Sequence, residues 1–353
     1  MSGNGMTGEN AFRSSKKLIP KEAFFHWLDS LRKRFRLLGP VKEGSQTVFR
    51  DIGSSKELSM DYGSTMLSPG KLFIYKPKEE LFRFSFNKGA SVDETPLTAE
   101  NQVIVGVHAC DTNAILYLDR TFLGGYRDPS YETRRKNTII ISLNCTQVTP
   151  NCFCSSVGSG PFLRAYKGYD ILLTDFDESY LVEIKSRRAA DLFNMEGKAA
   201  GSKEMEIKSE KEKSMLDQIT KKVDVEGLDR LFLENMDHPV WRHTAEARCL
   251  SCSNCVMVCP TCFCYHITDE TTMDLKMVKR IRHLDACQDI RFAEVYGGNF
   301  RSQRAARLRQ FVTHKMNQTG QYGVPGTVGC GRCITWCPTG IDLTEMTKEI
   351  QRS

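Results

Sequence analysis

Two runs of cysteine constrain this chain more than any other feature of its sequence. The first run, CLSCSNCVMVCP, begins at Cys249 and follows the pattern C-x2-C-x2-C-x3-C-P. The second run, CGRCITWCP, begins at Cys330 and repeats the last three cysteine positions and the proline of that pattern. Bacterial-type ferredoxins use this spacing to hold [4Fe–4S] clusters, and the last cysteine of each run ligates the cluster of the other run. The two runs are therefore expected to meet in the folded chain.

The spacing predicts two clusters with crossed ligands. The ligands expected for the first cluster are Cys249, Cys252, Cys255 and Cys337. The ligands expected for the second cluster are Cys259, Cys330 and Cys333. Two C-x-x-C pairs could instead hold zinc, but zinc would leave the third cysteine of each run and both C-P steps without a role. We therefore expect iron–sulfur clusters.

The second run lacks its first cysteine, because Thr327 stands where the spacing requires a ligand. A hydroxyl is a poor substitute, since iron–sulfur clusters select soft thiolates. The uncovered iron could be lost to leave [3Fe–4S], be held by water or a carboxylate, or take a spare thiol. The spare cysteines of this half of the chain are Cys262, Cys264 and Cys287. Of the three outcomes, we expect one of the first two.

Four further cysteines lie in the N-terminal half. Cys110 and Cys145 each follow the end of an expected strand, and Cys152 and Cys154 lie on the loop after the second of these strands. If the strands are neighbours, the four thiols converge at one edge of a sheet, where a third [4Fe–4S] cluster could bind. Four unrelated buried thiols are an equal alternative, because this spacing is not diagnostic.

The pattern of apolar and polar residues predicts an α+β fold: an N-terminal mixed α/β domain followed by an α-helical ferredoxin-like domain. The expected parts are a flexible tail over 1–18, the mixed α/β domain over 19–195, a polar linker or insertion over 196–214, and the α-helical [4Fe–4S] dicluster domain over 215–353. The segment MDLKMVKRIRHL, between the two runs, has a helix-like pattern. It favours the α-helical variety of ferredoxin domain.

The N-terminal domain is expected to open with a helix that begins at Pro20 and ends at Gly39-Pro40. Short apolar runs then predict strands, and the last two of these are close enough to form an antiparallel hairpin. The runs are 71–76, 81–86, 103–107, 137–143, 171–175 and 180–184.

Composition limits the partners and the compartment. The net charge of +6 is spread over 26% charged residues of both signs, so no nucleic-acid surface is expected. No apolar run approaches the ~18 residues of a membrane span, and the first residues contain no signal-peptide core. Fourteen cysteines without an export signal are expected to stay reduced. These features indicate a cytoplasmic protein without direct membrane insertion.

Several blocks of sequence together resemble a known family. The blocks are VGVHACDTNAILYLDRTF, DPSYETRRKNTIIISLNC, NCFCSS, RCLSCSNCVMVCPTCFCY and VGCGRCITWCPTGIDLTE. The combination is similar to the β subunit of cytoplasmic sulfhydrogenases and to the A subunit of anaerobic sulfite reductase. The resemblance implies a non-catalytic subunit that holds two [4Fe–4S] clusters. Such a subunit relays electrons between a flavoprotein subunit, which carries FAD and handles NAD(P)H, and a catalytic partner of the hydrogenase, sulfite reductase or heterodisulfide reductase type.

A second hypothesis belongs to a different class of function. It is a thiol- or cluster-based reductase in which Cys262, Cys264 and Cys287 act directly on a sulfur substrate. Reactive thiols are partly exposed and have a lowered pKa, so they should react with an alkylating reagent, whereas cluster ligands and buried thiols should not. The alternative for these three cysteines is that they are buried apolar thiols packed around the clusters.

Overall fold

An eight-stranded mixed sheet forms the centre of the N-terminal half. The computed structural model describes residues 15–86, 89–94, 97, 99–316 and 323–353. The order of strands is β10-β1-β9-β8-β7-β6-β2-β3, and β2, β6, β7 and β8 are parallel to one another. The strands are β1 (Ser15–Pro20), β2 (Arg36–Glu43), β3 (Gln46–Asp51), β6 (Gln102–His108), β7 (Thr138–Leu143), β8 (Ile171–Phe176), β9 (Ser179–Ile184) and β10 (Lys198–Ala199).

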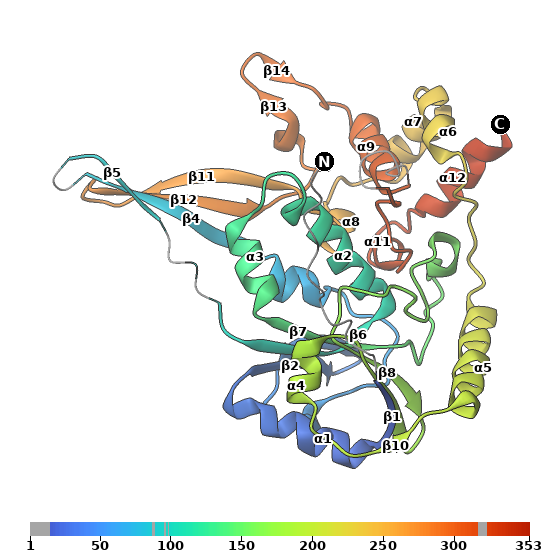
Figure 1. Ribbon diagram of the computed structural model, residues 1–353. Helices are drawn as coiled ribbons and strands as arrows, with labels where there is room; N and C mark the ends of the chain where they lie inside the picture. Colours follow the sequence, from blue (N-terminus) through green and yellow to red (C-terminus); the bar gives the residue numbers. More distant parts are fainter. Residues whose placement is uncertain (1–14, 87–88, 95–96, 98, 317–322) are drawn as a thin grey trace, which may run out of the picture.

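Helices cover both faces of this sheet, because its central strands are apolar on both sides. On one face, α1 (Lys21–Ser30) packs Leu28 against the sheet. On the other face, α2 (Ala109–Leu123) and α3 (Pro129–Lys136) cover the strands, and Leu118 is completely buried there. Figure 1 shows α1 below the sheet and α2 and α3 above it. The class of fold predicted from the sequence, α+β, is confirmed.

A β-bulge at Gly106 sets the direction in which β6 ends. Gly106 has a φ of +78°, and the register of β6 against β7 shifts between Val105 and Val107. As a result, Val105 packs on the α1 side of the sheet, whereas Val107 packs on the α2 side. Glycine adopts this backbone conformation without strain. The bulge thereby sets the direction of His108, which is the last residue of β6, and of Cys110, which lies in the first turn of α2.

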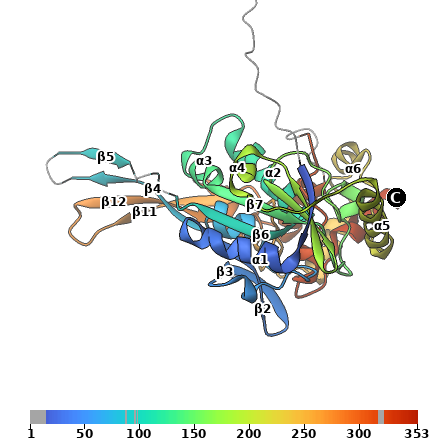
Figure 2. The same cartoon turned by 60° about the horizontal axis from the view of Figure 1, so that its bottom comes forward.

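A second, antiparallel sheet joins the two halves of the chain. Its order is β11-β12-β4-β5, so that β12 from the C-terminal half pairs with β4 from the N-terminal half. The strands are β4 (Lys78–Ser85), β5 (Ser91–Glu94), β11 (Tyr265–Thr271) and β12 (Met277–Leu284). Figures 1 and 2 both show this sheet as a long ribbon that extends away from the rest of the molecule.

Short helices surround the cysteine runs at the other end of the molecule (Figure 1). The remaining helices of the described ranges are α4 (Arg187–Leu192), α5 (Ser202–Gln218), α6 (Leu228–Glu234), α7 (Pro239–Ala247), α8 (Asn254–Met257), α9 (Arg304–Met316), α11 (Arg332–Thr335) and α12 (Leu343–Arg352). Single turns are η1 (Leu31–Lys33), η2 (Ser55–Glu57), η3 (Gly70–Ile74), η4 (Cys154–Val157) and η5 (Ile290–Ala293), and a small hairpin joins β13 (Glu294–Val295) to β14 (Gly298–Asn299).

Three elements of local structure differ from those predicted from the sequence. The first helix ends at Ser30, and Gly39-Pro40 lies inside β2. Pro40 is tolerated there because the pairing of β2 with β6 ends at Leu38, so no ladder hydrogen bond is lost on that side. The run 71–76 contains the π-helical turn η3 instead of a strand. The helix-like segment between the cysteine runs forms β12, because β4 and β11 pair with it on both sides.

The expected tail and linker also differ from the structure. Residues 15–18 of the expected tail belong to β1, and residues 1–14 lie outside the described part of the chain. The polar segment 196–214 contains β10 and most of α5. Ion pairs fix this polar helix, since Lys208 pairs with the buried Glu183 of β9. The expected strands 81–86, 103–107, 137–143, 171–175 and 180–184 are present, and the last two form a hairpin.

Buried ion pairs attach the projecting sheet to the rest of the fold. Glu79 of β4 accepts hydrogen bonds from Arg134 of α3 and from Arg282 of β12. Arg282 also donates to Asp128, which caps the N-terminus of α3. The side chains of Glu79, Arg134 and Arg282 are all less than a tenth exposed. One carboxylate thus compensates two buried guanidinium groups from distant parts of the chain.

We predict that Glu79→Ala lowers the free energy of unfolding by about 3–5 kcal/mol, because it leaves the buried guanidinium of Arg134 without a carboxylate and Arg282 with Asp128 alone. Urea denaturation followed by circular dichroism measures this loss. Asp269→Ala is the matched control, since it breaks the exposed pair between Asp269 and Arg280 in the same sheet and should have a much smaller effect. Equal losses for the two variants would contradict the importance of the buried network.

Candidate iron–sulfur sites

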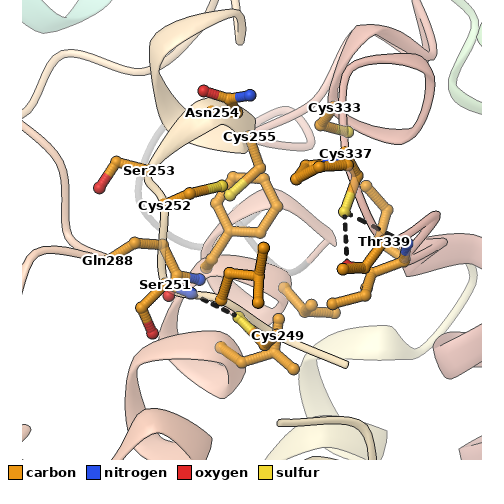
Figure 3. A pocket seen from close by; sticks show the side chains of 17 residues that line it. Cys249, Ser251, Cys252, Ser253, Asn254, Cys255, Gln288, Cys333, Cys337 and Thr339 are labelled. Atoms are coloured by element: carbon orange, nitrogen blue, oxygen red, sulfur yellow. Dashed lines mark hydrogen bonds between the residues drawn. The ribbon is translucent and has the colours of Figure 1, made fainter. Parts of the chain in front are cut away.

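The two cysteine runs meet, as the crossed pattern predicts. The cysteines that line the first hollow are Cys249, Cys252, Cys255, Cys333 and Cys337. The hollow has a volume of about 520 Å³, and apolar side chains such as Leu308 and Phe311 of α9 line it as well. Figure 3 shows the labelled cysteines arranged around this space. The five thiols include all four ligands expected for the first cluster, and with their apolar surroundings these four form a suitable donor set.

The same local backbone conformation positions thiols in both runs. Ser253 follows Cys252 in the first run, and Gly331 follows Cys330 in the second run. Both residues have left-handed backbone angles, with φ of +68° and +73°. Each caps a short helix, α8 or α11, whose first turn carries the next cysteine of its run. At Gly331 a side chain is excluded, because a Cβ would lie 2.3 Å from the carbonyl oxygen of Asn151.

Hydrogen bonds reach the sulfur atoms of the first group. The backbone N–H of Ser251 donates to Sγ of Cys249 (3.4 Å), and that of Ile341 donates to Sγ of Cys337 (3.3 Å). Burial disfavours the Cys337 thiolate, but hydrogen bonds from Thr339 and from backbone N–H groups outweigh it and lower the pKa of Cys337. Such bonds stabilise thiolate ligands and shift the reduction potential of a cluster.

The second group is more deeply enclosed than the first. Cys259 and Cys330 are buried, and Cys333 is partly buried. Burial raises the pKa of Cys333, and interaction with the sulfur atoms of Cys259 and Cys330 raises it further. Thr327 does not complete the set in this arrangement, because its Oγ1 accepts a hydrogen bond from the backbone N–H of Gly329 (3.2 Å).

The four N-terminal cysteines converge at the carboxyl ends of β6 and β7. The cysteines that line this second hollow are Cys110, Cys145, Cys152, Cys154 and Cys330. The volume of the hollow is about 430 Å³. Burial and the sulfur of Cys152 raise the pKa of Cys154 to about 12. The structure therefore brings together the four thiols that the strand ends were expected to collect, although whether they hold a cluster stays a prediction.

Sequence reasoning missed two polar residues that line this second hollow. His108 is buried and stacks on Tyr62, with ring centroids 3.9 Å apart. Its Nε2 has no hydrogen-bond partner in the described part of the chain, and burial lowers the pKa of His108 to about 3. The second residue, Arg332, forms a buried ion pair with Asp111 (2.8 Å). Both residues lie two positions from a cysteine, Cys110 or Cys330, in the sequence blocks that resemble the known family, and this proximity could have indicated them.

The three spare cysteines of the C-terminal half lie in or against the hydrophobic core of that half. Cys262 and Cys287 are buried, and Cys264 is partly exposed. The Cys262 thiol donates a hydrogen bond to the sulfur of Cys259, and the Cys287 thiol donates one to the sulfur of Cys264. The hydrogen bond from Cys287 outweighs the effect of burial and lowers the pKa of Cys264 to about 7.

Within the described residues, no three His, Cys, Asp or Glu side chains are close enough to hold a single metal ion. An iron–sulfur cubane has different requirements, since its irons and sulfides occupy the space between the protein ligands. The two hollows provide such a space between the thiols.

Comparisons with known proteins identify the family of the chain. Residues 248–341 match the family model of a 4Fe-4S dicluster domain. The sequence is also 34% identical to sulfhydrogenase 2 subunit beta of Pyrococcus furiosus over 343 residues, which cover 94% of this chain and 97% of the relative. The chain belongs to the sulfhydrogenase β-subunit family. No solved structure matches it.

Membership of the sulfhydrogenase β-subunit family confirms the class expected from the cysteine runs. The chain is an iron–sulfur electron-transfer subunit with [4Fe–4S] clusters, and the match to the dicluster model spans both runs. The residues matched by the dicluster family, 248–341, include neither the N-terminal cysteines nor the sheet that positions them. In the described ranges no helix is long and apolar enough to cross a membrane.

We predict that an alkylating reagent modifies Cys264 in preference to Cys262 and Cys287 at pH 7, because Cys264 is partly exposed and has a thiolate-favouring pKa. Labelling should slow as the pH falls through 7 and the thiolate takes up a proton. Cys287→Ala removes the hydrogen-bond donor, so the pKa should rise toward its usual range and labelling at pH 7 should slow about tenfold. Mass spectrometry of iodoacetamide adducts measures each site, and an unchanged rate in Cys287→Ala would contradict this interpretation.

Proposed function

We propose that the chain relays electrons through three iron–sulfur clusters held by neighbouring groups of thiols. The observation that carries this proposal is the position of α11. Cys333, in this helix, lines the first hollow, whereas Cys330, two residues before the helix begins, lines the N-terminal hollow. Two cysteines three positions apart in one short segment therefore connect the donor sets of all three proposed clusters, and electron transfer between clusters requires such proximity.

Each proposed cluster has its own ligands. Those of the first are Cys249, Cys252, Cys255 and Cys337, those of the second include Cys259, Cys330 and Cys333, and those of the third are Cys110, Cys145, Cys152 and Cys154. When bound, the clusters supply one-electron transfer. The chain supplies thiolates, burial and N–H donors to sulfur, which set the reduction potentials. The second cluster is [3Fe–4S] unless another group covers the corner beside Thr327.

We further propose two partners in the cytoplasm: a flavoprotein subunit that carries FAD and oxidises NAD(P)H, and a catalytic redox subunit. The relative is described as a subunit of a sulfhydrogenase, which supports assembly with other subunits. No Walker A loop occurs in the sequence, so the nucleotide chemistry is assigned to a partner. The chain has fourteen cysteines, and those that act as ligands must stay reduced, which favours the cytoplasm.

A second candidate function is direct reduction of a sulfur substrate by thiols. The observation that favours it is the pair of Cys264 and Cys287, since Cys264 is partly exposed and has a pKa of about 7. Cys262 is buried against Cys259 and fits this hypothesis less well. The relay remains the better-supported proposal, because it accounts for both hollows and for the meeting of the two runs.

We predict that the full chain, reconstituted with iron and sulfide without air, binds about twelve iron atoms, or about eleven if the second cluster lacks a corner. Cys152→Ala should bind about four fewer, because it removes a ligand of the third cluster alone. Iron and acid-labile sulfide analysis measures both. Cys287→Ala is the control and should retain the full content. The experiment uses the full chain, since an N-terminal fragment would lose the pairing of β4 with β12.

Two results would contradict the proposal in different ways. If Cys152→Ala binds as much iron as the unaltered chain, the N-terminal hollow holds no cluster and the relay has two members. If the unaltered chain binds zinc and no iron–sulfur cluster, the relay itself is wrong.

A further inference from the structure

The turn that follows the first cysteine run places an additional thiol beside the second group. In the sequence Cys259-Pro260-Thr261-Cys262, the N–H of Cys262 donates to the carbonyl oxygen of Cys259 (3.3 Å), so the chain forms a tight turn. The Cys262 thiol donates a hydrogen bond to the sulfur of Cys259. Cys259 and Cys262 therefore form a C-x-x-C pair with both sulfurs on one side of the turn, and Cys330 and Cys333 form another.

This turn is attached directly to the segment in which the second run lacks its cysteine. The hydroxyl of Thr261 donates to the carbonyl oxygen of Gly326 (2.6 Å), which is the residue immediately before Thr327. Lys315 reinforces the attachment, because its Nζ donates both to Oγ1 of Thr261 and to the carbonyl oxygen of Gly326 (3.1 Å each). The Cys262 turn consequently lies against the position from which a ligand at 327 would have reached the cluster.

Two buried cations show that the site is built for negative charge. Lys315 and Lys71 are 1% and 3% exposed, and both ammonium groups lie close to Cys259 and Cys262. Lys71 donates to the carbonyl oxygens of Val256 and Met257 (3.1 Å each), which are neutral. Across the described ranges, no carboxylate forms an ion pair with either lysine. A buried ammonium needs a compensating charge, and the sulfur atoms of Cys259 and Cys262 lie beside both lysines, where a negatively charged cluster would supply it.

The other spare thiols are engaged with each other. Cys264 accepts a hydrogen bond from Cys287, and this pair lies beyond Cys262 along the chain. Thr327 is also engaged, since its hydroxyl accepts a hydrogen bond from the N–H of Gly329. Cys262 is thus the spare cysteine that combines contact with a proposed ligand, complete burial and neighbouring positive charge.

We propose that Cys262 is the fourth thiolate ligand of the second cluster, which is then held by the pairs Cys259–Cys262 and Cys330–Cys333 and keeps four irons. The proposal rests on the function proposed above, in which Cys259, Cys330 and Cys333 already ligate this cluster. On ligation the Cys262 thiol loses its proton to water, and a sulfur lone pair forms the bond to the fourth iron without a change in oxidation state. Cys262 thereby replaces the cysteine that is absent at position 327.

Electron paramagnetic resonance of the oxidised, reconstituted full chain tests this assignment, because [3Fe–4S]⁺ gives a signal and oxidised [4Fe–4S]²⁺ does not. The unaltered chain should give no [3Fe–4S] signal. Cys262→Ala should give this signal at about one spin per chain with the loss of about one iron atom, or lose the whole second cluster with about four. Cys264→Ala, two residues away in the same loop, is the matched control and should resemble the unaltered chain.

A second substitution separates ligation from a structural role. In the double variant Cys262→Ala, Thr327→Cys, a thiol returns at the position that the ferredoxin spacing specifies, so the signal should disappear and the iron content should recover. Packing of Cys262 alone would not be restored by a cysteine at 327. A [3Fe–4S] signal in the unaltered chain, equal behaviour of Cys262→Ala and Cys264→Ala, or failure of the double variant to recover would each overturn the assignment. An unaltered chain that binds no cluster at all would instead refute the proposed function.

Discussion

A buried ion pair between Arg332 and Asp111 holds the two halves of the site together. Both nitrogen atoms of the Arg332 fork donate to the carboxylate of Asp111 at 2.8 Å, and Arg332 also donates to the carbonyl oxygen of Thr65 (2.6 Å). Arg332 lies between Cys330 and Cys333, and Asp111 follows Cys110. The pair therefore fixes the second cysteine run against the N-terminal thiols. Removing one partner of such a buried pair typically costs about 3–5 kcal/mol, so the arrangement of all three thiol groups depends on it.

The thiol groups share this framework but differ in their surroundings. The first group borders an open hollow and receives hydrogen bonds from backbone N–H groups. The second is enclosed and lies beside the cations Lys71 and Lys315. Solvent exposure, hydrogen bonds to sulfur and nearby charge all influence the reduction potential of a cluster. The chain thus has the means to give neighbouring clusters different potentials, which a directional relay requires.

Features that depend on local spacing could be predicted from the sequence, whereas features that depend on distant pairing could not. The spacing of the cysteine runs identified residues that do meet, and the strands before Cys110 and Cys145 were correctly expected to bring these thiols together. The segment that forms β12 was expected to be helical from its local pattern. That pattern could not reveal the strand, because β12 pairs with β4, whose residues are about two hundred positions away. Arg332 and His108 were missed, since their burial results from contacts that no local pattern records.

The central claim is that the clusters form a connected series, and their magnetic interaction tests it most directly. Paramagnetic clusters that lie close together broaden and split one another's resonance signals. We expect the fully reduced chain to give an interaction-broadened electron paramagnetic resonance spectrum at low temperature, and expect this spectrum to become simpler when a ligand of the N-terminal group is removed by Cys145→Ala. A reduced spectrum equal to the sum of independent, unbroadened signals, unchanged in Cys145→Ala, would show that the three thiol groups do not hold a connected series of clusters.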